Sequence, residues 1–213
     1  IKYMTAKEED ILTNQNYIQN GTVIDKLLKS LIVTKFNYEE LLIGDKNAIM
    51  IASRILGYGA EYKFTYNGKE EVADLSKIDN KPFDESLITK GINEFSFKLP
   101  SSDNDITFKF LTHGDESKIN QELEGLKKLG KEGSPELTTR LKYVVTSING
   151  DRTTKLIREF IDEAFLARDA RAFREYIGKV QPDVDLTFFP ESSTKSITLP
   201  IGISFFWPDV DLG

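Results

Sequence analysis

The chain has 213 residues, a net charge of −6 and no cysteine. This length is enough for one large domain or two small ones with a sizeable buried core. The charge argues against broad binding to nucleic acid or to anionic membranes, and no apolar run reaches the roughly 18 residues of a membrane span. The absence of cysteine excludes disulfides, thiolate catalysis and cysteine-ligated metal sites.

The first 59 residues have the period of amphipathic helices. A capping box begins at Thr5, and residues 23–31 place their apolar side chains on one helical stripe. Asp45 is the expected N-cap of the next helix, which ends at Gly57 and Gly59 because glycine accepts the left-handed conformation after a helix.

From residue 60 the hydrophobic period changes to two. Tyr62, Phe64 and Tyr66 alternate with polar residues, and the following Asn67-Gly68 pair is typical of a two-residue hairpin turn. Apolar alternation on both sides of a Ser/Asp/Asn turn predicts a second hairpin over 94–111.

Helical patterns return after Gly114. One helix is expected to end near Gly130, and a second to run from Pro135 at its first position to Asn149. A third carries apolar residues over 156–165, and a fourth restarts at Asp169 and stops before Pro182.

The C-terminal segment has strand character again, with Val184, Leu186 and Phe188 in alternation before a turn and a long second strand. Because a two-stranded hairpin is marginal alone, we expect this hairpin to dock on the central β segment. The predicted fold class is α+β, in which the N-terminal helices and the helices of 115–180 form one subdomain and the hairpins form another. The predicted boundaries are 1–59 with 113–182 for the helical subdomain, and 60–112 with 183–213 for the antiparallel β subdomain.

The predicted last strand has a large apolar face. Phe205 and Trp207 share this face with four aliphatic residues, so we expect both in the core together with Phe64 of the first hairpin. A bulge at Pro200 or Gly202 would exchange the two faces of the strand.

Two aromatic residues break this pattern and are candidate partner contacts. Phe206 falls on the small and polar face of the last strand, and Phe189 interrupts the alternation of the strand before it. Pro208 follows the aromatic cluster and is assigned to the same candidate surface. Protein interfaces usually bury a few such aromatic anchors.

A row of arginines is a further candidate surface. Arg168, Arg171 and Arg174 recur every three residues along one side of a predicted helix, where they are suited to clamp a partner's carboxylates. The alternative is a solvated helix side whose charge is balanced by Asp169 and Glu175.

No residue is nominated as catalytic, as a metal ligand or as a cofactor ligand. The phosphate-binding pattern GxxxxGK[ST] is absent, and the acidic groups in SSDNDI and WPDVDLG are explained by turn chemistry and a polar terminus. The enzyme alternative is a hydrolase that uses His113 with Asp115 and Glu116. We favour the interpretation that His113 is a solvated loop histidine, because no nucleophile pattern accompanies it.

Several stretches, taken in order, resemble the baseplate hub proteins of T-even-like contractile-tailed bacteriophages. The resemblance covers residues 4–209, and it lies in the order and spacing of the set rather than in any one motif. The stretches are MTAKEEDIL, GTVIDKLL, LLIGDKNAIMIASRILGYGAEY, DLSKI, FKFLTHGDE, REFIDEAFLARDARAFREYIGKVQPDVDL and LPIGISFFWPD.

The resemblance implies a non-enzymatic role in building the tail baseplate hub through contacts with other hub proteins. It implies a place in the host cytoplasm during assembly and then in the virion tail, and the first ten residues contain no apolar run of the secretory kind. It leaves open whether the chain is a hub component or an assembly factor absent from the virion. A small binding module unrelated to phage is the remaining alternative.

The chain departs from the pattern of its apparent relatives at two turns. Many relatives carry CxxC pairs in the turns of the first and last hairpins, resembling a split zinc ribbon. Here those turns read YNGK and PESSTK. A zinc site supplies folding free energy to a small β unit, so these hairpins must be held in another way.

Overall fold

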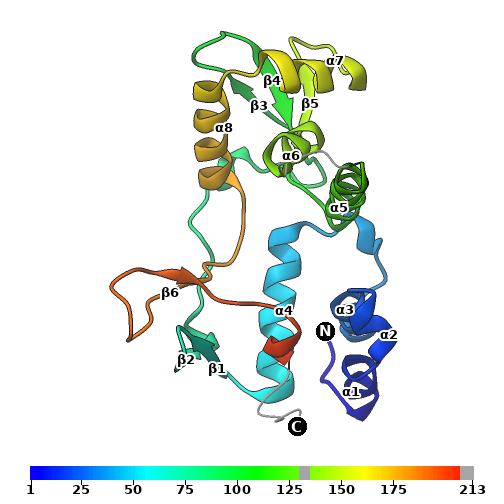
Figure 1. The fold of residues 1–213 in the computed structure, drawn as a ribbon, viewed down its shortest axis with the longest axis vertical. Helices are drawn as coiled ribbons and strands as arrows, with labels where there is room; N and C mark the ends of the chain where they lie inside the picture. The colour runs from blue at the N-terminus through cyan, green and yellow to red at the C-terminus, as the bar shows by residue number, and fades with distance from the viewer. Residues whose placement is uncertain (130–134, 207–213) are drawn as a thin grey trace. The chain divides into compact units, whose positions relative to one another are not determined.

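The computed structural model describes residues 1–129 and 135–206, and it confirms the α+β class (Figure 1). Helices alternate along the chain with antiparallel sheets of two or three strands. The chain divides into two compact units. Of the described residues, the first unit comprises 1–36, 44–81 and 183–206, and the second comprises 37–43, 82–129 and 135–182.

This division differs from the predicted one. The first and last hairpins lie with the N-terminal helices, and the middle hairpin lies with the helices of 113–182. In the second unit, Phe97 and Phe108 of the middle hairpin pack on Phe173 of a helix. In the first unit, Phe64 of the first hairpin packs on Phe188 of the last. A half-buried strand needs any complementary apolar surface, and its alternation does not say whether a helix or a sheet supplies it.

The first unit begins with four helices. The fourth begins at Ile43, two residues before Asp45, so Asp45 lies in its first turn and is not the N-cap. Two hairpins complete the unit, and the last strand is followed by a short 3₁₀ helix. The helices are α1 (Ala6–Leu12), α2 (Gln15–Gln19), α3 (Val23–Leu31), α4 (Ile43–Tyr58), η2 (Leu75–Lys77) and η5 (Ile203–Phe206), and the strands are β1 (Glu61–Tyr66), β2 (Lys69–Asp74), β6 (Thr187–Phe188) and β7 (Ile197–Thr198).

The predicted docking of the last hairpin on the first is observed. The rings of Phe64 in β1 and Phe188 in β6 meet edge to face at 5.3 Å. The Glu71 side chain of β2 accepts hydrogen bonds from the backbone N–H groups of Glu191 and Ser192, at 3.0 and 3.2 Å, and from the Ser192 hydroxyl at 2.5 Å. A buried carboxylate thus holds the turn of the last hairpin.

The last strand is much shorter than predicted. Its ladder with β6 includes only Ile197 and Thr198, and Leu199 adds one further backbone bond before Pro200. Proline has no N–H to donate, so it ends the ladder, and the chain turns into η5.

The prediction for Phe206 is therefore wrong, because the alternation on which it rested does not continue. Phe205 and Phe206 are both completely buried, with ring centroids 5.2 Å apart. Phe205 also meets the ring of Tyr62 at 4.8 Å, which confirms its place in the core. Trp207 and Pro208 lie outside the described residues.

The second unit is built on a three-stranded antiparallel sheet in the order β3-β4-β5. The segment from Val145 was predicted as helix but forms a strand. Its sequence VTSI is rich in β-branched residues, and β4 offers it a pairing edge. The strands are β3 (Phe95–Lys98), β4 (Asp105–Phe108) and β5 (Val145–Ile148), and the helices are η1 (Tyr38–Glu40), η3 (Glu85–Leu87), α5 (His113–Lys128), α6 (Glu136–Val144), α7 (Thr154–Glu159), the π-helical turn η4 (Phe160–Ala164) and α8 (Ala167–Val180).

One face of this sheet carries the core of the second unit. Phe108 of β4 is completely buried and meets Phe173 of α8 at 5.1 Å between ring centroids. Phe97 of β3 packs on the same α8 ring at 5.5 Å and on Tyr176 at 4.7 Å. These contacts fix α8 against the sheet.

We predict that Phe206→Ala lowers the free energy of unfolding by about 3–5 kcal/mol, because it removes a completely buried aromatic ring. Phe189→Ala is the matched control, because Phe189 lies in the same C-terminal segment with 71 % of its surface exposed. Its effect is expected to stay within about 0.5 kcal/mol. Denaturant unfolding measures both, and equal losses in the two variants would contradict the assignment.

Candidate partner-binding surface

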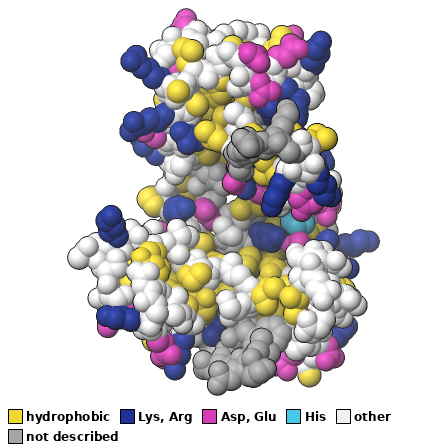
Figure 2. All heavy atoms as spheres, in the orientation of Figure 1, with side chains coloured by type: hydrophobic (Ala, Val, Ile, Leu, Met, Phe, Trp, Pro, Cys, Tyr) yellow, Lys and Arg dark blue, Asp and Glu magenta, His cyan; other side chains and the backbone are white. Residues whose placement is uncertain are grey.

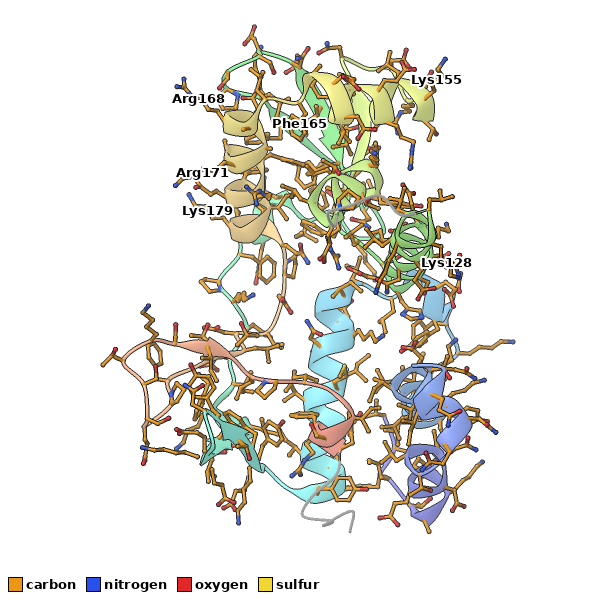
Figure 3. The ribbon with its side chains drawn as sticks, in the orientation of Figure 1. Lys128, Lys155, Phe165, Arg168, Arg171 and Lys179 are labelled. Carbon is orange, nitrogen blue, oxygen red and sulfur yellow. The ribbon has the colours of Figure 1, made fainter. Side chains whose placement is uncertain are left out.

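The outer side of α8 is a row of exposed cations. Because successive helix residues are about 100° apart, the exposed residues of α8 fall in one sector of about 140°. Figure 3 shows three labelled members, Arg168, Arg171 and Lys179, pointing away from the body of the unit. We call this surface the α8 cation face, and it consists of Ala167, Arg168, Arg171, Arg174, Glu175, Gly178 and Lys179.

The structure brings together the three predicted arginines and adds Lys179. Lys179 follows Arg168 by eleven residues, which is three helical turns, so the same periodicity that aligned the arginines identifies it. In Figure 2, Lys and Arg side chains project from the edge of the molecule where α8 lies. The face extends about 16 Å from Arg168 to Lys179 at 1.5 Å per residue.

The opposite side of α8 holds this face in place. Ala170, Phe173 and Val180 are buried, and Phe173 is in contact with aromatic rings of β3 and β4. Their spacing is the helical one, so one helix presents an apolar side to the sheet and a basic side to solvent. Packing on the sheet therefore fixes which side of α8 carries the cations.

The prediction that Asp169 balances the positive charge of the arginines is wrong. Asp169 is completely buried and points away from the cation face. Its carboxylate accepts the backbone N–H groups of Ser101 at 2.7 Å and Ser102 at 3.0 Å, at the turn between β3 and β4. Burial opposes ionisation, but the hydrogen bonds from Ser102 and Ser101 outweigh it and lower the pKa of Asp169.

Glu175 does lie on the face, as expected, and its Oε1 accepts a hydrogen bond from Arg171 at 2.9 Å. Arg174 donates to the backbone carbonyl of Ala170 at 3.2 Å. Arg168 and Lys179 have no charged or hydrogen-bonded partner among the described residues. The face therefore carries four cations and a single carboxylate.

The remaining predicted contact, Phe189, is exposed as expected. It lies in the turn between β6 and β7, next to the residues whose backbone Glu71 holds. The hydrogen bonds to Glu71, led by that from the Ser192 hydroxyl, lower the pKa of Glu71 and keep it ionised at neutral pH. Sequence reasoning missed Glu71, because an acidic residue at an ordinary strand position gives no sign of its distant partner.

The groups of the enzyme alternative have structural partners. His113 is buried at the start of α5, not in a solvated loop, and its ring meets Tyr38 edge to face at 4.7 Å. Asp115 belongs to the capping box of α5, and each of its carboxylate oxygens accepts from Lys109 at 2.7 Å. Glu116 pairs with an arginine of α6 at 2.5 Å.

The face of the three-stranded sheet away from α8 has a shallow hollow of about 440 Å³ over a row of hydroxyls. Thr146 donates to Glu94 at 3.1 Å, and since a carboxylate only accepts, Thr107 donates to Thr146 and Ser147 donates to Thr107. Arg152 binds both oxygens of Glu94 and is the main cause of its lowered pKa. The row of hydrogen bonds thus joins β4 and β5 to Glu94, whose ionised form is favoured by Arg152.

Within the described residues, no group of three His, Asp or Glu side chains gathers in a way that could hold a metal ion. None of the described helices is both long and apolar enough to cross a membrane. Comparisons of the chain with protein-family models, curated proteins and solved structures gave no match. The resemblance to baseplate hub proteins therefore stays a prediction.

We predict that Asp169→Asn destabilises the protein at pH 7 by about 1–3 kcal/mol, because one amide oxygen cannot replace both carboxylate oxygens for the two buried N–H groups. The folded pKa is lowered, so the contribution of Asp169 is present above its unfolded pKa, about 3.9, and is lost as the pH falls through the folded value. The difference between wild type and variant in denaturant unfolding should therefore shrink below about pH 4.

The control for this measurement is Glu175→Gln on the exposed side of the same helix. It should change the free energy of unfolding by no more than about 0.5 kcal/mol, both at pH 7 and at pH 3. A difference between wild type and Asp169→Asn that stays constant from pH 7 to pH 3 would contradict the role given to the ionised carboxylate.

Proposed function

We propose that the chain is a structural or assembly protein of a phage tail baseplate hub and acts through contacts with other hub proteins. The proposal rests on the ordered stretches over 4–209 that resemble hub proteins. The structural observation that carries it is the α8 cation face, which is exposed, poor in carboxylates and mounted on a buried aromatic core.

The geometry suits recognition better than chemistry. A rigid face with several guanidinium groups can bind carboxylates in defined positions, and arginine does this through planar, paired hydrogen bonds. A tail assembles from many proteins in order, so each contact must reject wrong partners as well as accept the right one. Charge complementarity supplies that discrimination, because like charges brought together cost several kcal/mol.

The exposed Phe189 is a second contact of a different kind. Aromatic side chains are enriched among the residues that dominate interface energetics. Phe189 follows Phe188, which packs on Phe64, and it precedes the turn that Glu71 holds. Its backbone is therefore fixed on both sides, so binding would lose little conformational entropy.

We favour a retained hub component over an assembly factor that leaves the finished particle. An affinity-tagged chain, expressed in cells that are assembling tails, is expected to co-purify with tail proteins identified by mass spectrometry. The same tagged chain from cells that make no tails is the control. Recovery of the chain only in free form, while tails are being made, would contradict the proposed function.

Mass spectrometry of purified virions distinguishes the two roles within this function. A hub component is present in the particles at a constant ratio to other tail proteins. An assembly factor is present in the lysate and missing from the particles.

A further inference from the structure

The arginines of the second unit fall into two groups. Those outside α8 each pair with a glutamate of another element: Arg152 with Glu94, Arg140 with Glu116, and Arg158 with a glutamate of α5. Among the described residues, the three on α8 have one ion pair, between Arg171 and Glu175 of the same helix, and Arg174 donates to the Ala170 carbonyl. Among the described residues, the arginines of the second unit that have no carboxylate of another element as a partner thus lie together on α8.

A glycine on this face has no explanation in the chain's own packing. Gly178 lies inside α8, where glycine is unfavourable, and its φ is not positive. A Cβ built on Gly178 would meet no atom within 4 Å. On the helical projection, Gly178 falls between Arg171 and Arg174, in line with Ala167. At Gly178, near one edge of the cation face, the helix therefore has no side-chain bulk between the columns of Arg171 and Arg174.

We infer that the α8 cation face binds an acidic α-helix of a partner protein, whose backbone approaches at Gly178 and whose carboxylates meet the flanking cations. Small residues allow two helix backbones to come close. Glu or Asp residues spaced three and four apart on the partner would match cations that recur at the same spacing. This inference rests on the proposed function in one respect: the partner protein is expected among the tail proteins. The binding surface is the same α8 cation face.

The charge distribution favours an acidic helix over nucleic acid. The chain as a whole carries −6, so a long polyanion would be repelled beyond the limits of the face. A single helix of about 16 Å covers the face and little else. Glu175, which lies among the cations of the face, would also oppose a continuous phosphate backbone.

The test uses the full chain and a synthetic helical peptide of about 18 residues with Glu repeated at three- and four-residue intervals. Its Gln-substituted version is the ligand control. We expect fluorescence anisotropy to show binding of the Glu peptide, weakened by raising the salt from about 50 to 300 mM, and no binding of the Gln peptide. The double variant Arg168→Glu with Arg171→Glu should weaken binding by about tenfold or more.

A matched control comes from two exposed lysines elsewhere in the second unit, both labelled in Figure 3. Lys128 has no ion pair among the described residues, as Arg168 has none. Lys155 pairs with Glu159 four residues later, as Arg171 pairs with Glu175. The double variant Lys128→Glu with Lys155→Glu thus changes the net charge by the same amount as Arg168→Glu with Arg171→Glu. It also removes one ion pair within a helix, as that variant does. Binding within about twofold of wild type is expected for this control, and an equal loss would show that only net charge matters and overturn the inference.

Gly178→Gln separates helix docking from simple charge attraction. Glutamine favours the helix over glycine, so the melting temperature should rise, while its bulk should weaken peptide binding severalfold. Undiminished peptide binding would contradict close approach of a partner helix. Tighter binding of a 20-base-pair DNA duplex than of the peptide, lost in the Arg168→Glu, Arg171→Glu variant, would replace the acidic helix with nucleic acid as the occupant.

The inference and the proposed function fail in different experiments. If tail proteins co-purify with the wild-type chain but the Glu peptide does not bind, the acidic helix is wrong and the hub function stands. If the peptide binds as expected but no tail protein co-purifies, the cation face is a docking site and the hub function is wrong.

Discussion

The contact of Phe173 with the sheet β3-β4-β5 is the constraint on which the candidate surface depends. Phe173 is completely buried and meets Phe97, Phe108 and Phe165. Truncating such a ring typically costs 3–5 kcal/mol, a large part of the marginal stability of a domain. Because this side of α8 must face the core, helical geometry forces Arg168, Arg171 and Lys179 outward.

Buried carboxylates in both units accept hydrogen bonds that hold turns and chain segments in place. Within the first unit, Glu8 accepts hydrogen bonds from Lys2, Thr5 and Ser30, and Glu71 holds the turn of the last hairpin. Within the second, Asp169 holds the turn between β3 and β4. A carboxylate can accept several N–H and O–H groups at once, so it can tie a turn to a distant element without a disulfide or a metal. Burial raises the pKa of Glu8, but the hydrogen bonds lower it by more than burial raises it. The net pKa is lowered, so the folded structure stabilises the charged form of Glu8.

Sequence patterns predicted the fold well where one local period decides the element. The capping box at Thr5, the hairpin at Asn67-Gly68 and the helical side occupied by the arginines are all present. Sequence patterns gave the wrong element where strand pairing or a contact between distant residues decides the secondary structure. The apolar residues of 145–148 fit a helix or a strand, and pairing with β4 selects the strand. The alternation through Phe206 requires a ladder that Pro200 ends.

The sequence by itself determined which side of α8 is apolar and which is basic, since a period of 3.6 residues is a property of the helix alone. Only the tertiary structure decided that Asp169 leaves the basic side, because a carboxylate cannot be assigned to the Ser101 and Ser102 N–H groups until the turn between β3 and β4 is placed beside α8. The same holds for Phe206, whose burial follows from the turn of the chain into η5. Local periodicity sets the faces of an element, and packing across the chain decides which side chains those faces leave free for a partner.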